Sequence, residues 1–193
     1  MMTRLSEVFD GWGGYQTSLV HAIAPLTEDQ LGWKPSEKLR SIGELATHIA
    51  MGRIVWFVRM KAPGSEELAA KIAAWSYDPE GNGYIDEKAM KIDRDAGALV
   101  GWLESTWEMI DATLKAWTVD DLKVGYRHVW REDVYEITRQ WTVWRILSHD
   151  IHHGGQIARI LAERGIDAPE LRGLGGHIVS PVKTGKADVA NRG

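Results

Sequence analysis

The chain has 193 residues, which is enough for one hydrophobic core and short for two, so the sequence predicts a single domain. Hydrophobic residues make up 44% of it and charged residues 26%, and a formal net charge of -4 leaves no basic excess to neutralise a phosphate backbone, which argues against a nucleic-acid partner. The absence of cysteine excludes disulfides, thiolate metal ligands and a cysteine nucleophile, and it fits a reducing cytoplasm.

The N-terminal segment MMTRLSEVFDGW contains charges and lacks the apolar stretch of a signal peptide. No apolar run approaches the roughly 18 residues that a membrane span needs. We therefore expect a cytoplasmic protein that does not cross a membrane. Ten tryptophans against two phenylalanines indicate large flat side chains in a core, a pocket or a subunit interface.

Apolar residues at three- and four-residue spacing predict a first amphipathic helix from Leu5 to Ile23, although Gly13 and Gly14 weaken its middle. A short segment from Thr27 to Leu31 follows. The turn-rich stretch Trp33 to Ser36 then ends any helix.

The second long helix begins clearly, because Ser41 and Glu44 have the spacing of a capping box. The apolar pattern carries this helix to about Met60. A weaker helical segment, Glu66 to Trp75, and the turn-rich sequence YDPEGNG follow. This region reads as an excursion between long helices that could cover a site.

The third long helix is predicted from about Asp86 to Trp117, with a break near Gly97 or Gly101 as an alternative, since its length exceeds the usual range. The segment from Lys123 to Tyr135 fits either a short extended pair or an irregular loop. The sequence alone does not choose between these two forms.

The fourth long helix begins at Val134 or Thr138, runs to Arg164 and stops at Gly165, a typical residue after a helix end. We expect residues 167–193 to form a mostly irregular tail behind a helical domain of residues 1–166. The predicted fold is therefore all-α, a four-helix bundle with short extra helices or loops between the long helices.

Three of the seven histidines lie in one five-residue stretch of the predicted fourth helix, inside the sequence SHDIHHGGQ from Ser148 to Gln156. At about 100° per residue, His149 and His153 project from one helix face one turn apart, and Gln156 lies near the same stripe. His152 could pair with His149 but faces another direction. We therefore prefer His149 and His153 as metal ligands, with Gln156 either orienting an imidazole or serving as an ordinary helix residue.

A stable metal site needs a third ligand from another element. His48 is the best candidate, because it lies on the apolar stretch of the second helix, and Glu44 and Arg59 share its face. His177 is a substitute if the tail folds back, whereas His21 and His128 have no such context. Three neutral imidazoles would leave the ion open positions and favour Lewis-acid chemistry.

The sequence resembles the DinB-like (YfiT-like) metalloprotein superfamily in three places: Trp33-Lys34-Pro35, Ser41 to Leu45 with His48, and His149 to Gln156. The resemblance spans roughly residues 5–164. It implies a four-helix bundle, frequent homodimers, and a divalent metal bound by one histidine of the second helix and an HxxxH pair of the fourth. In this sequence these ligands are His48, His149 and His153. Many members have arginine directly before the Gly-Gln pair, where this sequence has Gly154.

Known activities in that superfamily include transferases that use the thiols glutathione, mycothiol or bacillithiol, and a thiol-dependent maleylpyruvate isomerase. The resemblance thus favours an enzyme in which a low-molecular-weight thiol attacks a small electrophilic molecule at the metal site. An external thiol also fits the absence of cysteine. Arg59 or Arg145 could hold an acidic substrate, since Arg145 lies one turn before His149.

Two other functions stay open. A metal-dependent hydrolase would use metal-bound hydroxide as its nucleophile, with Glu44 as a candidate general base, although the capping box already engages this carboxylate. A non-catalytic metal-binding or stress-response protein would use the ion to join the second and fourth helices, and it predicts a closed site without a pocket. Zinc is the expected metal, and nickel, iron or manganese also suit neutral histidines.

Overall fold

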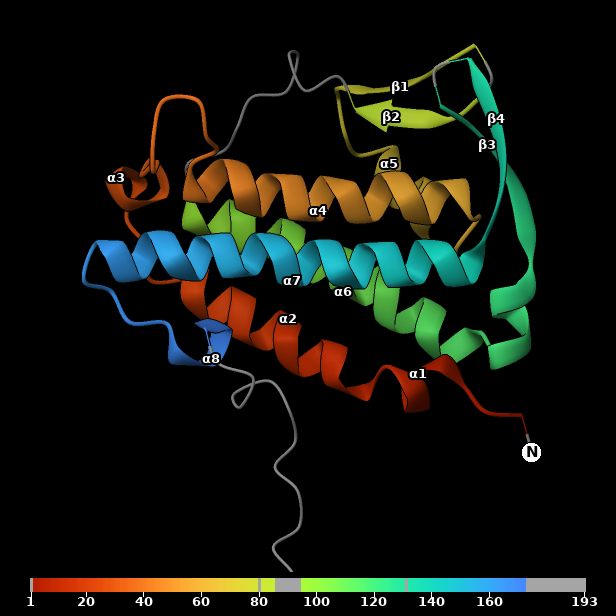
Figure 1. The fold of residues 1–193 in the computed structure, drawn as a ribbon, viewed down its shortest axis with the longest axis horizontal. Helices are drawn as coiled ribbons and strands as arrows, with labels where there is room; N and C mark the ends of the chain where they lie inside the picture. The colour runs from red at the N-terminus through yellow and green to blue at the C-terminus, as the bar shows by residue number, and fades with distance from the viewer. Residues whose placement is uncertain (1, 80, 86–94, 131, 173–193) are drawn as a thin grey trace, which may run out of the picture.

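The computed structural model describes residues 2–79, 81–85, 95–130 and 132–172. Four long helices pack along one another as a bundle around one apolar core (Figure 1). In chain order, the second long helix contacts the third and the fourth, and the first long helix also contacts the third and the fourth. The all-α four-helix bundle predicted from the sequence is thus confirmed. The long helices are α2 (Asp10–Ile23), α4 (Ile42–Arg59), α6 (Ala96–Ala116) and α7 (Arg139–Glu163).

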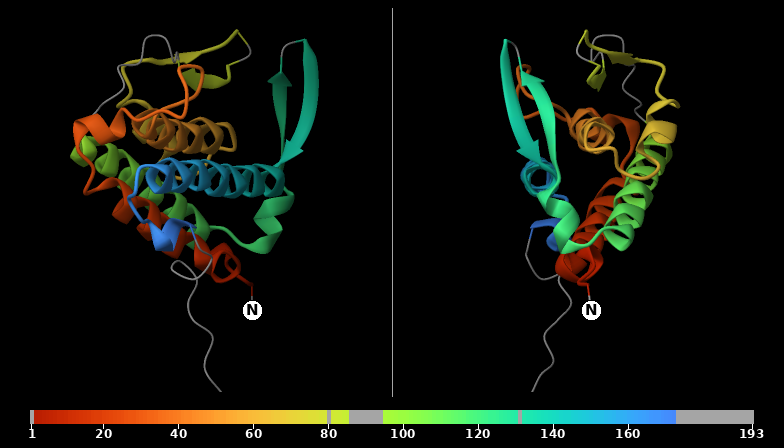
Figure 2. Two further views of the ribbon diagram at one scale, coloured as in Figure 1. Left: turned by 60° about the vertical axis from the view of Figure 1, so that its left-hand side comes forward. Right: turned by 90° about the vertical axis from the view of Figure 1, so that its right-hand side faces the viewer.

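Short helices and two antiparallel hairpins fill the connections between the long helices. The second hairpin extends beside the bundle near the start of α7 (Figure 2). These elements are α1 (Leu5–Val8), α3 (Glu28–Leu31), α5 (Ser65–Ala69), β1 (Trp75–Tyr77), β2 (Gly83–Ile85), the 3-10 helix η1 (Val119–Lys123), β3 (Gly125–Trp130), β4 (Asp133–Thr138) and α8 (Pro169–Arg172).

The predicted first helix is interrupted at Phe9, where φ is -109° and ψ is 30°, so it becomes α1 and α2. Both glycines that weakened the pattern stay within α2. The N–H of Leu5 instead bonds to the carbonyl of Trp117, 3.0 Å away, and this contact ties α1 to the end of α6. The break thus coincides with a backbone contact between distant parts of the chain, which a local sequence pattern does not reveal.

The capping box of α4 is confirmed. The Ser41 hydroxyl accepts from the Glu44 N–H at 3.2 Å, and the Glu44 carboxylate accepts from the Ser41 N–H at 2.6 Å. Two N–H groups that would otherwise lack partners at the helix start are thus satisfied. The helix then runs to Arg59, one residue short of the predicted end.

The excursion after α4 is less helical than the sequence predicted. The helix expected over Glu66 to Trp75 ends at Ala69, and Trp75 begins β1, opposite Ile85 of β2. The indole of Trp75 lies against Gly83, where a β-carbon would overlap the ring. This cross-strand packing brings together residues that lie too far apart in sequence for helical periodicity to reveal it.

The third long helix is shorter than expected at its N-terminal end. Asp95 caps α6 by accepting from the Ala98 N–H at 3.1 Å, and residues 86–94 of the expected helix lie outside the described residues. The helix continues through Gly97 and Gly101 without the break that the sequence left open.

The ambiguous segment before the fourth helix is a hairpin, with Gly125 opposite Thr138 and Trp130 opposite Asp133. The second strand runs directly into α7, whose first turn is capped by the Thr138 hydroxyl. The later of the two predicted starts is thus correct. At the other end, Gly165 has a φ of 78°, which confirms the predicted helix stop.

The tail begins with the short helix α8, which packs against α2 and α7. The rest of the predicted irregular tail lies outside the described residues, and the domain boundary after residue 166 stays a prediction. Among the described residues, no helix combines the length and apolar character needed to cross a membrane.

Candidate metal centre

Three histidines meet between α4 and α7. His48 comes from α4, and His149 and His153 stand one turn apart on α7. The His48 ring centroid lies 4.8 Å from each of the other two, which are 4.4 Å apart. One ring nitrogen from each histidine lies within 4.8 Å of the other two. The structure thus brings together the three residues that the sequence singled out.

Gly52 allows this approach of the two helices. A β-carbon at this position would lie 3.0 Å from Cε1 and 3.4 Å from Nε2 of His149, which is closer than ordinary contact. Gly52 follows His48 by one helical turn, so the same face of α4 supplies one histidine and receives another.

Burial disfavours the charged form of two of the three histidines, His48 and His153. It lowers the pKa of His48 to about 3, and the charges of Arg40, His149 and His153 add to the effect. Burial also lowers the pKa of His153, against a hydrogen bond from its ring to Gln156 that raises it. Neutral imidazole is the form that binds metal ions.

Gln156 orients the His153 ring. Its carbonyl oxygen Oε1 accepts from Nδ1 of His153 at 2.8 Å, and its Nε2 lies 3.2 Å from Nε2 of His152. Because the amide oxygen can only accept, His153 carries its proton on Nδ1 and keeps the lone pair on Nε2. His152 turns toward Gln156 and lies outside the three-histidine group.

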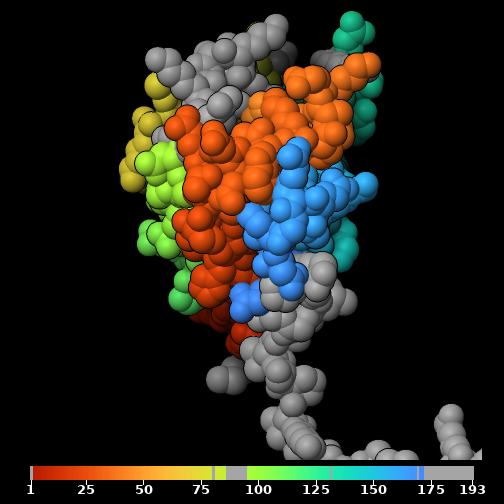
Figure 3. Space-filling view, turned by 90° about the vertical axis from the view of Figure 1, so that its left-hand side faces the viewer, coloured from red at the N-terminus to blue at the C-terminus, as the bar shows by residue number. Residues whose placement is uncertain are grey.

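The histidines line an open pocket of about 1150 Å³. Its wall includes the segment that leads into α4 and the C-terminal part of α7, which lie together in orange and blue in Figure 3. Apolar side chains such as Met51, Val55 and Trp56 cover one part. Five cationic side chains and two carboxylates supply the charge: Lys34, Lys38, Arg40, Arg145, Arg159, Glu37 and Glu44. The pocket is therefore basic in a chain whose net charge is -4.

The two arginines proposed for substrate binding differ in position. Arg145 lines the pocket, with its guanidinium 4.7 Å from the Trp56 ring centroid and 5.3 Å from that of Trp141. Arg59 lies over the same Trp56 ring at 4.7 Å, but it donates to the carbonyl of Gly83 at 3.3 Å and is not among the described residues that line the pocket. Burial lowers the pKa of Arg59.

Glu44 lines the pocket but is already engaged. Besides the Ser41 N–H, it accepts from Nζ of Lys34 at 3.0 Å. Burial acts to raise the pKa of Glu44, but the hydrogen bonds from Ser41 and Lys34 outweigh it and lower the pKa. An ionised carboxylate held by two donors is a weak general base.

The other histidines lie elsewhere. His21 contacts Glu170 at 3.3 Å on the surface, and His128 packs against the Trp56 ring with centroids 5.1 Å apart. His177, the substitute ligand, lies outside the described residues. Of the tryptophans nearest the site, Trp56 is buried and Trp144 is 65% exposed.

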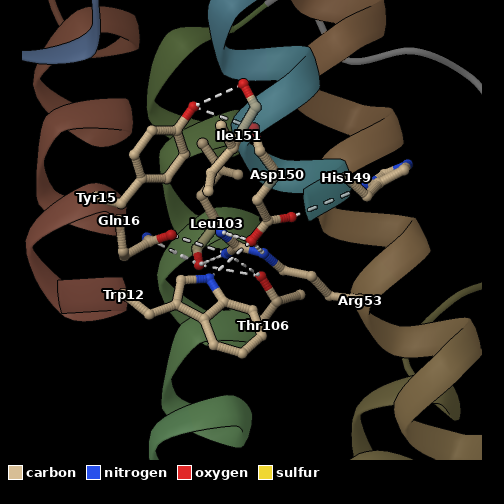
Figure 4. A network of polar contacts seen from close by, with 9 residues as sticks. All are labelled: Trp12, Tyr15, Gln16, Arg53, Leu103, Thr106, His149, Asp150 and Ile151. Atoms are coloured by element: carbon tan, nitrogen blue, oxygen red, sulfur yellow. Dashed lines mark hydrogen bonds and ion pairs between the residues drawn. The ribbon is translucent and has the colours of Figure 1, made fainter. Parts of the chain in front are cut away.

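Sequence reasoning missed an ion pair under the cluster, between Arg53 of α4 and Asp150 of α7, which are both 0% exposed (Figure 4). Nη2 of Arg53 lies 2.8 Å from Oδ2 of Asp150, and its Nε donates to the same oxygen at 2.9 Å. A signal existed, because Arg53 lies in the apolar stripe of α4 that includes Ile49 and Phe57. A charged residue in such a stripe indicates a buried partner.

Gly154 has a packing reason, since a β-carbon there would overlap the Tyr15 hydroxyl of α2. That hydroxyl donates to the carbonyls of Asp150 at 3.1 Å and Ile151 at 3.2 Å. A side chain at this position would therefore point at α2 and away from the pocket. Glycine at position 154 is thus explained by the packing of α2 against α7.

The family model that matches the chain is that of the DinB superfamily, over residues 15–157. A crystal structure of a DinB-like protein from Bacillus cereus ATCC 10987 is similar in fold, with a TM-score of 0.62 and 14% identity over 88% of this chain and 98% of that one. A DinB-like protein, YjoA, from Bacillus subtilis has a TM-score of 0.54 and 16% identity, over 82% and 92% of the two chains. No curated protein matches the sequence.

Proposed function

The chain belongs to the DinB superfamily, and on that premise we propose that it binds one divalent metal ion through His48, His149 and His153 and transfers a low-molecular-weight thiol to a small electrophile. The observation that carries the proposal is the position of the three histidines, close together in the wall of an open pocket of about 1150 Å³.

The residues present fit a metal ion. Zinc–imidazole bonds are about 2.0–2.1 Å long, so nitrogens within 4.8 Å of one another need only small ring rotations to reach one ion. The low pKa of His48 and the bond from His153 to Gln156 keep lone pairs available for ligation. We propose zinc as the ion, with nickel, iron or manganese as alternatives that metal analysis would identify.

A divalent ion held by three neutral ligands supplies Lewis acidity and lowers the pKa of a thiol that binds beside it. In the proposed transfer, the thiol sulfur forms a bond to an electrophilic carbon, the leaving group departs with its bonding electron pair, and the thiol proton passes to solvent. The chain has no cysteine, so the thiol is external. We place this chemistry in the cytoplasm, where small thiols are kept reduced.

We propose that the electrophile carries an anionic group that Arg145 binds. Two tryptophan rings flank this guanidinium, and it makes no ion pair with any residue that the structure describes. Its N–H groups are therefore available to a carboxylate. The basic lining of the pocket also favours an anionic substrate, because it concentrates anions near the histidines. Met51 and Val55 offer an apolar wall to the rest of the molecule.

The two alternatives are less well supported. A hydrolase that uses Glu44 as its general base is disfavoured, because this carboxylate is occupied by Ser41 and Lys34. A purely structural metal site would be closed, whereas these histidines line an open pocket.

We also propose that the protein forms a homodimer. Its support is the exposed apolar face of α7, where Trp144 is 65% and Ile151 is 49% exposed. Analytical ultracentrifugation of the wild type and Trp144→Ser tests this, and a monomeric wild type would contradict it.

Metal analysis of the purified protein tests the site. We expect about one bound divalent ion per chain, lost in His149→Ala and kept in His21→Ala, whose side chain is exposed beside Glu170. Equal metal content in both variants, or none in the wild type, would refute the site. Conjugation assays with a panel of thiols and electrophiles then test the transfer, and bound metal without turnover for any thiol would refute the transferase activity alone.

A further inference from the structure

A buried carboxylate lies directly behind one of the three histidines. Asp150 follows His149 on α7 and is 0% exposed. Its two oxygens have different surroundings (Figure 4). Oδ2 receives Nε of Arg53 at 2.9 Å and Nε1 of Trp12 at 3.0 Å, and Nη2 of Arg53 lies 2.8 Å away. Oδ1 is buried and has no hydrogen-bond partner among the described residues.

The His149 ring nitrogen near Oδ1 also lacks a hydrogen-bond partner among the described residues. This nitrogen, Nδ1 of His149, lies 3.9 Å from Oδ1 and is also buried. Buried polar atoms rarely stay unpaired. A protonated Nδ1 is a donor and the carboxylate oxygen an acceptor, so an approach of about 1 Å would join them at normal hydrogen-bond length.

The other members of the network hold Asp150 in place. Nη1 of Arg53 donates to Gln16 at 2.8 Å, to Thr106 at 3.2 Å and to the carbonyl of Leu103 at 3.3 Å. Arg53 and its partners thus link α2, α4, α6 and α7, the four helices of the bundle. The carboxylate is therefore held in place by partners from several helices.

We infer that Asp150 is a positioning residue, whose Oδ1 accepts from Nδ1 of His149 and so keeps the lone pair of this histidine on Nε2 for the metal ion. The inference rests on the proposed metal site. Carboxylates that accept from a ligating histidine fix its tautomer and raise its affinity for the ion. His153 receives the equivalent contact from Gln156, so two of the three ligands would be oriented by a neighbour on α7.

The substitution Asp150→Asn has a specific expected effect. Three nitrogen atoms crowd around Oδ2, so the asparagine would keep its oxygen there and turn its amide N–H₂ toward His149. An N–H₂ facing Nδ1 favours the tautomer with the lone pair on Nδ1, which is the wrong one for ligation through Nε2. We expect zinc affinity to fall about 10- to 100-fold.

Trp12→Phe is the matched control, because it removes a donor to Oδ2 and leaves Oδ1 and His149 untouched. We expect it to bind zinc with nearly wild-type affinity, measured by competition with a chromophoric chelator. Equal losses in both variants would reduce Asp150 to a structural role and overturn the inference.

A second measurement uses the unaltered protein and does not depend on how Asp150→Asn folds. Long-range ¹H–¹⁵N correlation spectra of the metal-free and zinc-loaded wild type report which nitrogen of His149 carries the proton, with His149→Gln identifying its signals. We expect Nδ1 to be protonated in both states. An unprotonated Nδ1 would overturn the inference. Failure of the wild type to bind zinc, nickel, iron or manganese would refute the proposed function, and the metal-free spectrum would still test the Asp150 contact.

Discussion

We expect Gly52→Ala to weaken metal binding strongly while the bundle stays folded. The added methyl group would lie 3.0 Å from Cε1, 3.4 Å from Nε2 and 3.6 Å from Nδ1 of His149. Carbon atoms in contact prefer about 3.5–4.0 Å, so the ring or α4 must move by roughly 0.5 Å. Metal–ligand distances tolerate about 0.2 Å. The displacement is thus larger than the site accepts.

The expected loss of zinc affinity is about 10- to 100-fold, comparable to the loss of a group that orients a ligand. The free energy of unfolding should change by less than the free energy of zinc binding. Alanine is favoured over glycine inside a helix by about 1 kcal/mol, and this gain offsets part of the clash. The variant therefore separates the geometry of the site from the stability of the fold.

The matched control is Gly101→Ala in α6, where nothing lies within 4 Å of the added group. It should raise the free energy of unfolding by about 0.4–1 kcal/mol and leave zinc affinity unchanged. Chelator competition measures the affinity, and urea denaturation of the metal-free proteins measures stability. The reasoning is refuted if Gly52→Ala binds zinc as tightly as the wild type and Gly101→Ala.

Three further substitutions test other parts of the structure. Arg53→Met should lower the free energy of unfolding by about 3–5 kcal/mol in urea denaturation, because it leaves the Asp150 carboxylate buried without its cation; a loss below about 1 kcal/mol would contradict this. Arg145→Gln should raise KM for carboxylate-bearing electrophiles about tenfold or more and spare neutral ones, since a charge-assisted hydrogen bond contributes about 1.5–3 kcal/mol; equal effects on both classes would exclude the proposed anion contact. Gly154→Ala should lower the melting temperature, because its methyl group overlaps the Tyr15 hydroxyl, and Tyr15→Phe in the same chain should restore part of the loss; an unchanged melting temperature would argue against this packing.

Much of the helical fold could be predicted because its signals are local. The Ser41–Glu44 capping box, the Gly165 stop and the apolar spacing of the long helices each involve residues within a few positions of one another. The HxxxH pair on α7 belongs to the same class, since helical geometry alone places His149 and His153 on one face.

The third histidine needed more than periodicity. His48 lies about a hundred residues from the pair, and local spacing could only mark it as a polar residue in an apolar stretch. Its place in that stretch made it the best candidate, the resemblance to a known family supported the choice, and the packing of α4 on α7 brings the rings to 4.8 Å. That His48, His149 and His153 hold a metal ion stays a prediction.

Other features depend on the tertiary structure. The two hairpins, the break at Phe9 and the approach of His149 to Gly52 are contacts between distant segments. The same holds for the pairing of Arg53 with Asp150, 97 positions apart.

The sequence by itself determined the four long helices and several of their ends, because a helix repeats every 3.6 residues and its caps are local. Only the packed bundle decided which side chains lie in the pocket, which are held by neighbours and which buried atoms face each other. These properties arise from distances between helices, and those distances depend on the side chains of all four helices at once.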